Sequence, residues 1–114
     1  MSKRYILVSE KGWHSMRQLS LDLADKGMSS TVLIRGMVDK AVRDMITKRR
    51  EINNVFIPGK IFTPFLFMYV LSGLILSQRN KVIIFLSKDK TFERFKSLKS
   101  IFSRLEPAMV NDKV

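Results

Sequence analysis

The chain has 114 residues, 46% of them hydrophobic and 27% charged, which is enough for one domain with a single core and argues against extensive disorder. Its 21 lysine and arginine residues outnumber 10 aspartate and glutamate residues, and the net charge of +11 favours anionic partners such as phosphates, nucleic acid or acidic lipid. Cysteine is absent, which excludes disulfides, thiolate metal sites and a cysteine nucleophile.

The first third of the chain has the pattern of a strand, a helix and a second strand. Apolar runs predict strands at Arg4–Ser9 and Ser30–Arg35. The stretch between them has apolar residues at helical spacing, namely Met16, Leu19 and Leu23, and Gly27 is placed to end that helix. This βαβ order predicts two parallel strands, with ligands binding outside their carboxyl ends.

The same alternation continues along the chain. Further elements are expected at Val38–Ile52 (helix), Asn54–Ile57 (strand), Ile61–Gln78 (helix), Lys81–Leu86 (strand) and Thr91–Leu105 (helix). The sequence therefore predicts a Rossmann-like three-layer α/β sandwich over residues 1–107, with a parallel sheet of about four strands and four helices. After Pro107, residues 108–114 are expected to be a frayed tail.

The stretch Ile61–Gln78 contains no charged residue over 18 positions, which meets the lower limit for a membrane span. Pro64 suits the first turn of a soluble helix, and a strand follows directly, so a buried or half-buried crossover helix is favoured. A helix lying in a membrane interface and a true span are the alternatives.

The last predicted helix carries phenylalanines on its apolar face and basic residues elsewhere. Those basic residues suit either a solvated helix surface or contact with phosphate or anionic lipid, and they are Arg94, Lys96, Lys99 and Arg104.

The turn after the first strand lacks the glycine spacing of dinucleotide and Walker phosphate loops, and no cofactor or metal is expected. His14, the single histidine, suits a general base at the ligand edge or a surface or capping residue. Asp89 is the first candidate for a carboxylate that orients this base, and Glu10 is the second. Asp89 equally suits the N-cap of the last helix.

The turn Gly12-Trp13-His14, the pattern Leu19-x-x-x-Leu23-Ala24-x-x-Gly27 and the run Thr31-Val32-Leu33 resemble the opening of the N-terminal domain of GT-B glycosyltransferases. The resemblance covers about thirty residues closely. It implies a domain that binds a lipid-linked or glycan acceptor and faces a nucleotide-sugar-binding domain or subunit, without which it is inactive.

By the same resemblance His14 is the base that deprotonates the acceptor and Asp89 the carboxylate that orients it. The substrate-contacting turn is expected to comprise Ser9, Glu10, Gly12 and Trp13. The protein is then expected in the cytoplasm, peripheral to the anionic inner face of a membrane.

The competing interpretation is a non-enzymatic basic α/β module that binds nucleic acid or a protein partner. Direct reading of nucleic acid is disfavoured because the aromatic residues of the last helix, Phe92, Phe95 and Phe102, share its apolar face.

Overall fold

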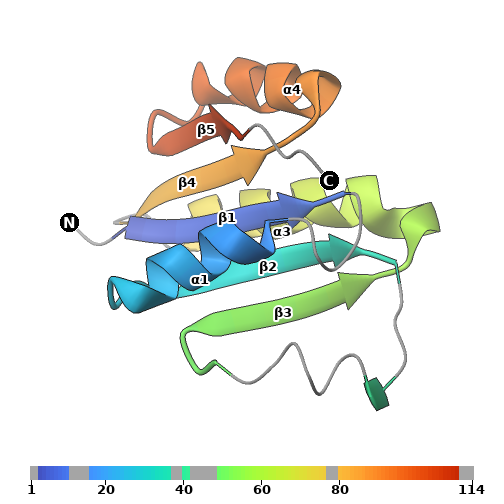
Figure 1. The fold of residues 1–114 in the computed structure, drawn as a ribbon. Coiled ribbons are helices and arrows are strands. Elements are labelled where there is room, and N and C mark those ends of the chain that lie inside the picture. Colours follow the sequence, from blue (N-terminus) through green and yellow to red (C-terminus); the bar gives the residue numbers. More distant parts are fainter. Residues whose placement is uncertain (1–2, 11–15, 37–39, 42–48, 77–79, 111–114) are drawn as a thin grey trace.

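The computed structural model describes residues 3–10, 16–36, 40–41, 49–76 and 80–110. These residues form a Rossmann-like α/β fold with a five-stranded parallel sheet in the order β3-β2-β1-β4-β5 (Figure 1). The strands are β1 Lys3–Ser9, β2 Ser30–Arg35, β3 Ile52–Ile57, β4 Lys81–Leu86 and β5 Leu105–Met109. The described helices are α1 Arg17–Asp25, α3 Phe62–Leu76 and α4 Asp89–Lys99, with the 3-10 helix η1 Gly59–Ile61 before α3.

Helices cover both faces of the sheet, α1 on one and α3 and α4 on the other (Figure 1). Successive strand residues point to opposite faces, so Ile6 and Val8 of β1 pack with α3 and α4, whereas Leu7 packs with α1. The α/β class and the parallel sheet predicted from the sequence are confirmed.

α1 shows part of the predicted buried stripe, since Leu19 is only partly buried, and it has the predicted end. Leu23 and Ala24 are buried against the sheet. Gly27 has a φ of +77° and its N–H donates to the Ala24 carbonyl at 2.9 Å, while the Met28 N–H donates to the Leu23 carbonyl at 2.9 Å. This is a Schellman end, in which glycine adopts the left-handed conformation without the cost of a Cβ. Met16 differs from the prediction, because it is buried but precedes the helix as a left-handed N-cap residue.

α3 buries one row of residues four positions apart, which are Phe62, Leu66, Val70 and Leu74. This row faces the sheet, because residues four apart lie on one side of a helix. α3 links β3 to β4, so it is the half-buried crossover helix that the sequence favoured. η1 precedes it, and Pro64 lies in its first turn.

The predicted count of four strands is wrong, because residues 105–109 form β5. β5 pairs with β4 from Val82↔Leu105 to Leu86↔Met109, so the predicted boundary between domain and tail falls inside a strand. Pro107 is compatible with this position because β5 is an edge strand, whose outer side needs no N–H donor. Residues 111–114 of the predicted tail lie outside the described residues.

Two predicted helix ends are also wrong. α4 ends at Lys99 and not at Leu105, because the apolar spacing that continues through Phe102 belongs to a turn packed on the core. β3 begins at Ile52, which was expected to end the helix beginning at Val38, and most of that helix lies outside the described residues. Three α-helices are described where four were predicted for the whole chain.

Candidate functional site

The order of the strands reverses between β1 and β4. After β1 the chain adds β2 and β3 on one side of it, and then crosses to add β4 and β5 on the other side (Figure 1). In open parallel sheets such a reversal leaves a crevice outside the carboxyl ends of the two central strands, because their connections leave in opposite directions. We call this region the switch edge, and it comprises the residue that follows β1 and the residues that follow β4 through the first turn of α4.

Glu10 and Thr91 meet at the switch edge. Glu10 directly follows β1, and Thr91 lies in the first turn of α4. Thr91 Oγ1 donates to Glu10 Oε1 at 3.4 Å, a long hydrogen bond. The two residues are 81 positions apart in the chain, so the pairing of β1 with β4 brings them together.

Two buried oxygen atoms at the switch edge have no hydrogen-bond partner among the described residues: Glu10 Oε2 and Ser87 Oγ. Ser87 directly follows β4, and because Leu7 of β1 pairs with Phe85 of β4, Glu10 and Ser87 leave the sheet at neighbouring points. A buried polar atom without a partner costs roughly 1–3 kcal/mol. Such atoms are rare in native proteins and are often completed by a ligand or by water.

Asp89 lies on the same edge, because it follows β4, and it is exposed. It is the first residue of α4, while the N-cap position belongs to Lys88, which makes no side-chain capping hydrogen bond. The N-cap interpretation of Asp89 is therefore wrong by one position. A carboxylate in the first turn still interacts favourably with the positive end of the helix dipole.

The other residues predicted at this turn divide into two groups. Ser9 is the last residue of β1, is fully buried and pairs with Ile34 of β2, so it belongs to the sheet. Gly12, Trp13 and His14 lie outside the described residues, and their roles stay predictions.

The four predicted basic contacts do not form one group. Arg94, Lys96 and Lys99 are exposed on α4. Arg104 instead donates to the Leu74 carbonyl in the last turn of α3 and to the Asn80 carbonyl at 3.2 Å. Its positive charge at the carboxyl end of α3 suits the helix dipole, so Arg104 has a structural role that the sequence did not indicate.

The outer side of α3 exposes apolar side chains together with Thr63, Pro64 and Ser72. Ile61 of η1 and Met68, Ile75 and Leu76 of α3 are 50%, 61%, 59% and 85% exposed. Among the described residues, Gly59–Leu76 is the one stretch long and apolar enough to cross a membrane, and 22% of it is buried in the domain. Core helices of soluble proteins also meet this criterion, so it is weak evidence for a span. The exposed apolar side chains of α3 are more specific evidence for contact with another apolar surface, because their exposure to water is unfavourable.

The described residues contain no group of three histidine, cysteine, aspartate or glutamate side chains that is placed to hold a metal ion. The chemistry that the described switch edge offers is hydrogen bonding by the carboxylates of Glu10 and Asp89 and by the hydroxyl groups of Ser87 and Thr91. A carboxylate oxygen accepts, and each hydroxyl both donates and accepts.

Comparisons of the chain with protein-family models, with curated proteins and with solved structures found no match. Fold and site therefore define the class by themselves: a Rossmann-like α/β domain with polar side chains collected at its switch edge.

The sequence interpretation named Glu10 and Asp89 but missed Ser87 and Thr91. A signal for Ser87 was present, because a hydroxyl residue directly after an apolar strand lies at the ligand edge of a parallel sheet. Thr91 had no such local signal, since its contact with Glu10 depends on which strand neighbours β1.

Proposed function

We propose that the chain is the acceptor-binding N-terminal domain of a GT-B type glycosyltransferase that works at a membrane surface. The observation that carries this proposal is the pair of partnerless buried oxygens at the switch edge, Glu10 Oε2 and Ser87 Oγ. A carboxylate beside a hydroxyl suits the hydroxyl groups of a sugar, which need both acceptors and donors. A nucleotide-sugar-binding domain or subunit would supply the donor.

His14 acts in this proposal as the general base that takes the proton of the acceptor hydroxyl. Glu10 and Asp89, which follow the two central strands, are the carboxylates available to orient it. Gly12 and Trp13 complete the turn that receives the acceptor.

The membrane surface is the face formed by α3 and α4. The rings of Phe67 on α3 and Phe95 on α4 are stacked with centroids 4.6 Å apart, so the two helices are neighbours. These two neighbouring helices expose apolar side chains on α3 and basic side chains on α4. Surfaces that combine apolar and basic side chains bind anionic membranes.

Acceptor binding is tested by NMR titration of the ¹⁵N-labelled chain with alkyl glycosides below their micellar limit, and separately with UDP. Glycosides are expected to shift the amides of Glu10, Ser87 and Thr91, and UDP is not. Glu10→Ala should weaken glycoside binding about tenfold, because a hydrogen bond to a charged group is lost. Glu93→Ala, which removes an exposed glutamate of α4, is the matched control. UDP shifts at the same amides would contradict an acceptor-side domain.

Membrane binding is tested by flotation with vesicles containing anionic lipid. The double variant Met68→Lys, Ile75→Lys should lose flotation without losing its fold, because both side chains are exposed. The control Gln18→Lys, Met28→Lys adds the same charge near α1 and should float normally. Preferential binding of an oligonucleotide, with a steep dependence on salt, would instead support a nucleic-acid-binding module.

A further inference from the structure

The amino-terminal edge of the sheet, opposite the switch edge, contains a pocket of about 320 Å³. It is formed where β1, β2 and β3 begin, and its walls include Lys3, Ser29, Ser30, Thr31, Arg50 and Asn53. We propose that this amino-edge pocket binds the phosphate group of a phosphomonoester. The proposal is independent of the acceptor function, which concerns the other edge.

The charge of the pocket favours an anion. Lys3 and Arg50 are exposed at its walls, and neither has an ion pair within the described part of the chain. Arg4 adds a third positive charge, although its guanidinium is held toward α3, where Nη2 donates to the Tyr69 hydroxyl at 2.9 Å. Cationic groups next to hydrogen-bond donors are the usual way in which proteins hold phosphate.

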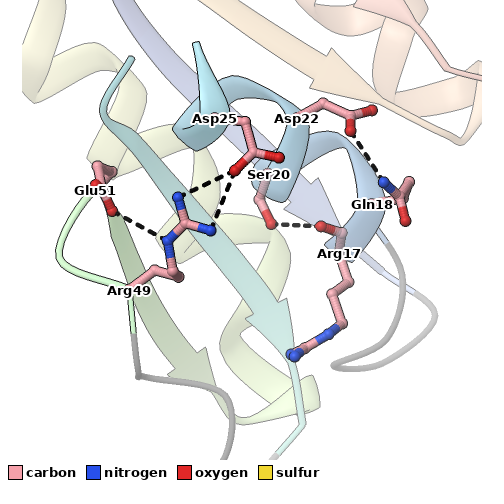
Figure 2. Close-up of polar contacts among 7 residues, drawn as sticks. All are labelled: Arg17, Gln18, Ser20, Asp22, Asp25, Arg49 and Glu51. Carbon is pink, nitrogen blue, oxygen red and sulfur yellow. Dashed lines mark hydrogen bonds and ion pairs between the residues drawn. The ribbon is translucent and has the colours of Figure 1, made fainter. Parts of the chain in front are cut away.

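The acidic residue of the pocket, Glu51, is compensated by a neighbour. Figure 2 shows Arg49 between two carboxylates, with Nε donating to Glu51 Oε2 at 3.4 Å and the other two nitrogens donating to Asp25 Oδ1 at 3.2 and 3.3 Å. The pKa of Glu51 is lowered by a hydrogen bond from its own backbone N–H and by Arg49. The charge of Arg50 also lowers the pKa of Glu51, and the positive charges of Lys3, Arg4 and Arg50 still outnumber this one carboxylate at the pocket.

Ser30 lines the pocket, and its hydroxyl oxygen is buried. Ser30 is 5% exposed, and its N–H donates to the Glu51 carbonyl at 2.8 Å, but its Oγ has no partner among the described residues. In this proposal the Ser30 hydroxyl turns toward the pocket when phosphate binds, and a phosphate oxygen then supplies the missing acceptor. Ser29, Thr31 and Asn53 also line the pocket and carry hydrogen-bond donors.

The size of the pocket points to a phosphomonoester and not to phosphate alone. Pockets for small organic ligands begin at roughly 300 Å³, so this one has room for part of the group that carries the phosphate. Arg4 connects this edge to α3, whose outer row is the proposed membrane surface. The phosphate can therefore belong to a soluble compound or to a lipid headgroup, and the experiment separates these sources.

The test is an NMR titration of the full chain with inorganic phosphate, with sodium chloride of equal ionic strength as reference. Phosphate should produce saturable shifts at the amides of Ser30, Thr31, Arg50 and Asn53 that chloride does not produce. In a second arm, vesicles containing phosphatidic acid are compared with vesicles containing phosphatidylglycerol, which lacks a monoester. Shifts with free phosphate indicate a soluble ligand, and shifts with phosphatidic acid alone indicate a headgroup. No selective shifts in either arm would overturn the proposal.

Two variants identify the binding residues. Arg50→Gln should weaken binding in the responding arm about tenfold, and Arg35→Gln, the same change at an exposed residue of the opposite edge of the sheet, should leave it unaltered. Ser30→Ala should weaken binding severalfold and yet raise the melting temperature of the free protein, because it removes an unpaired buried hydroxyl. Unchanged binding in both Arg50→Gln and Ser30→Ala would show that the phosphate binds elsewhere.

Discussion

α1 and α3 have the same task in the fold, since each connects two parallel strands, yet their outer faces differ completely. The outer face of α1 is polar, with Gln18 donating to Asp22 at 3.0 Å and Asp25 paired with Arg49 (Figure 2). The outer face of α3 exposes Met68 and Ile75.

This difference shows that packing on the sheet constrains the inner residues of a helix, whereas the surroundings of the domain constrain its outer residues. The inner row of each helix must be apolar, because the sheet it covers is apolar. The outer row is free of that requirement, so its composition reflects the medium that it meets. The polar outer face of α1 suits water, whereas the exposed apolar side chains of α3 suit the membrane contact that we have proposed.

The largest expected effect distinguishes the two rows of α3. Leu66→Ala should lower the free energy of unfolding by about 3–5 kcal/mol, because Leu66 is fully buried and its loss leaves a cavity. Met68→Ala, at a position that is 61% exposed, should cost less than about 0.5 kcal/mol. Urea unfolding measures both. Equal costs would mean that α3 does not have one buried and one exposed row.

A smaller effect is expected for the inner row of α1. Leu23→Ala should cost about 2 kcal/mol, at the low end of the range for buried leucines, because Leu23 keeps 8% of its surface exposed. The same unfolding experiment applies. A cost below about 0.5 kcal/mol would show that α1 contributes little to the core.

The end of α1 should be sensitive to backbone conformation. Gly27→Ala should cost about 1 kcal/mol, since a Cβ disfavours the φ of +77° although no atom lies within 4 Å of it. Gly27→Asn, a residue that tolerates this conformation better, should recover part of the loss in thermal unfolding. Equal stabilities of the glycine and alanine proteins would indicate that the Schellman end is not formed.

The smallest expected effect concerns pH. The pKa of Glu51 is lowered from its usual 4.5, so its carboxylate stabilises the folded state above that value and this contribution is lost as pH falls below it. Hydrogen-exchange protection should therefore fall in acid at Ser30, whose N–H donates to the backbone carbonyl of Glu51, before it falls at Val70 of α3. Glu51→Gln should abolish this difference and Glu93→Gln should keep it. Parallel loss at both places would exclude a local effect.

Much of the fold was predictable because its signals are local. The apolar runs of β1, β2 and β4 and the glycine that ends α1 each lie within a few residues of sequence. β5 was missed because Pro107 suggests an irregular tail, and only its place at the edge of the sheet makes a proline acceptable. The end of α4 was misplaced because the spacing through Phe102 suits a helix and a packed turn equally.

The sequence predicted which segments of the chain contribute to the candidate site, but it did not predict the contacts between them. Glu10 and Asp89 stood out because they follow apolar runs. The contact of Glu10 with Thr91 and the unpaired oxygen of Ser87 required the knowledge that β1 and β4 are neighbours.

The amino-acid order alone determined the succession of strands and crossover helices, the basic character of the chain and the apolar composition of α3, since periodicity, charge and hydrophobicity are properties of short segments. The tertiary structure alone decided that residues 105–109 form a strand, that Arg104 holds the end of α3, and that one row of α3 stays uncovered. These outcomes depend on pairing between segments distant in the chain, because a hydrogen bond or a packing contact forms only where the sheet places both partners.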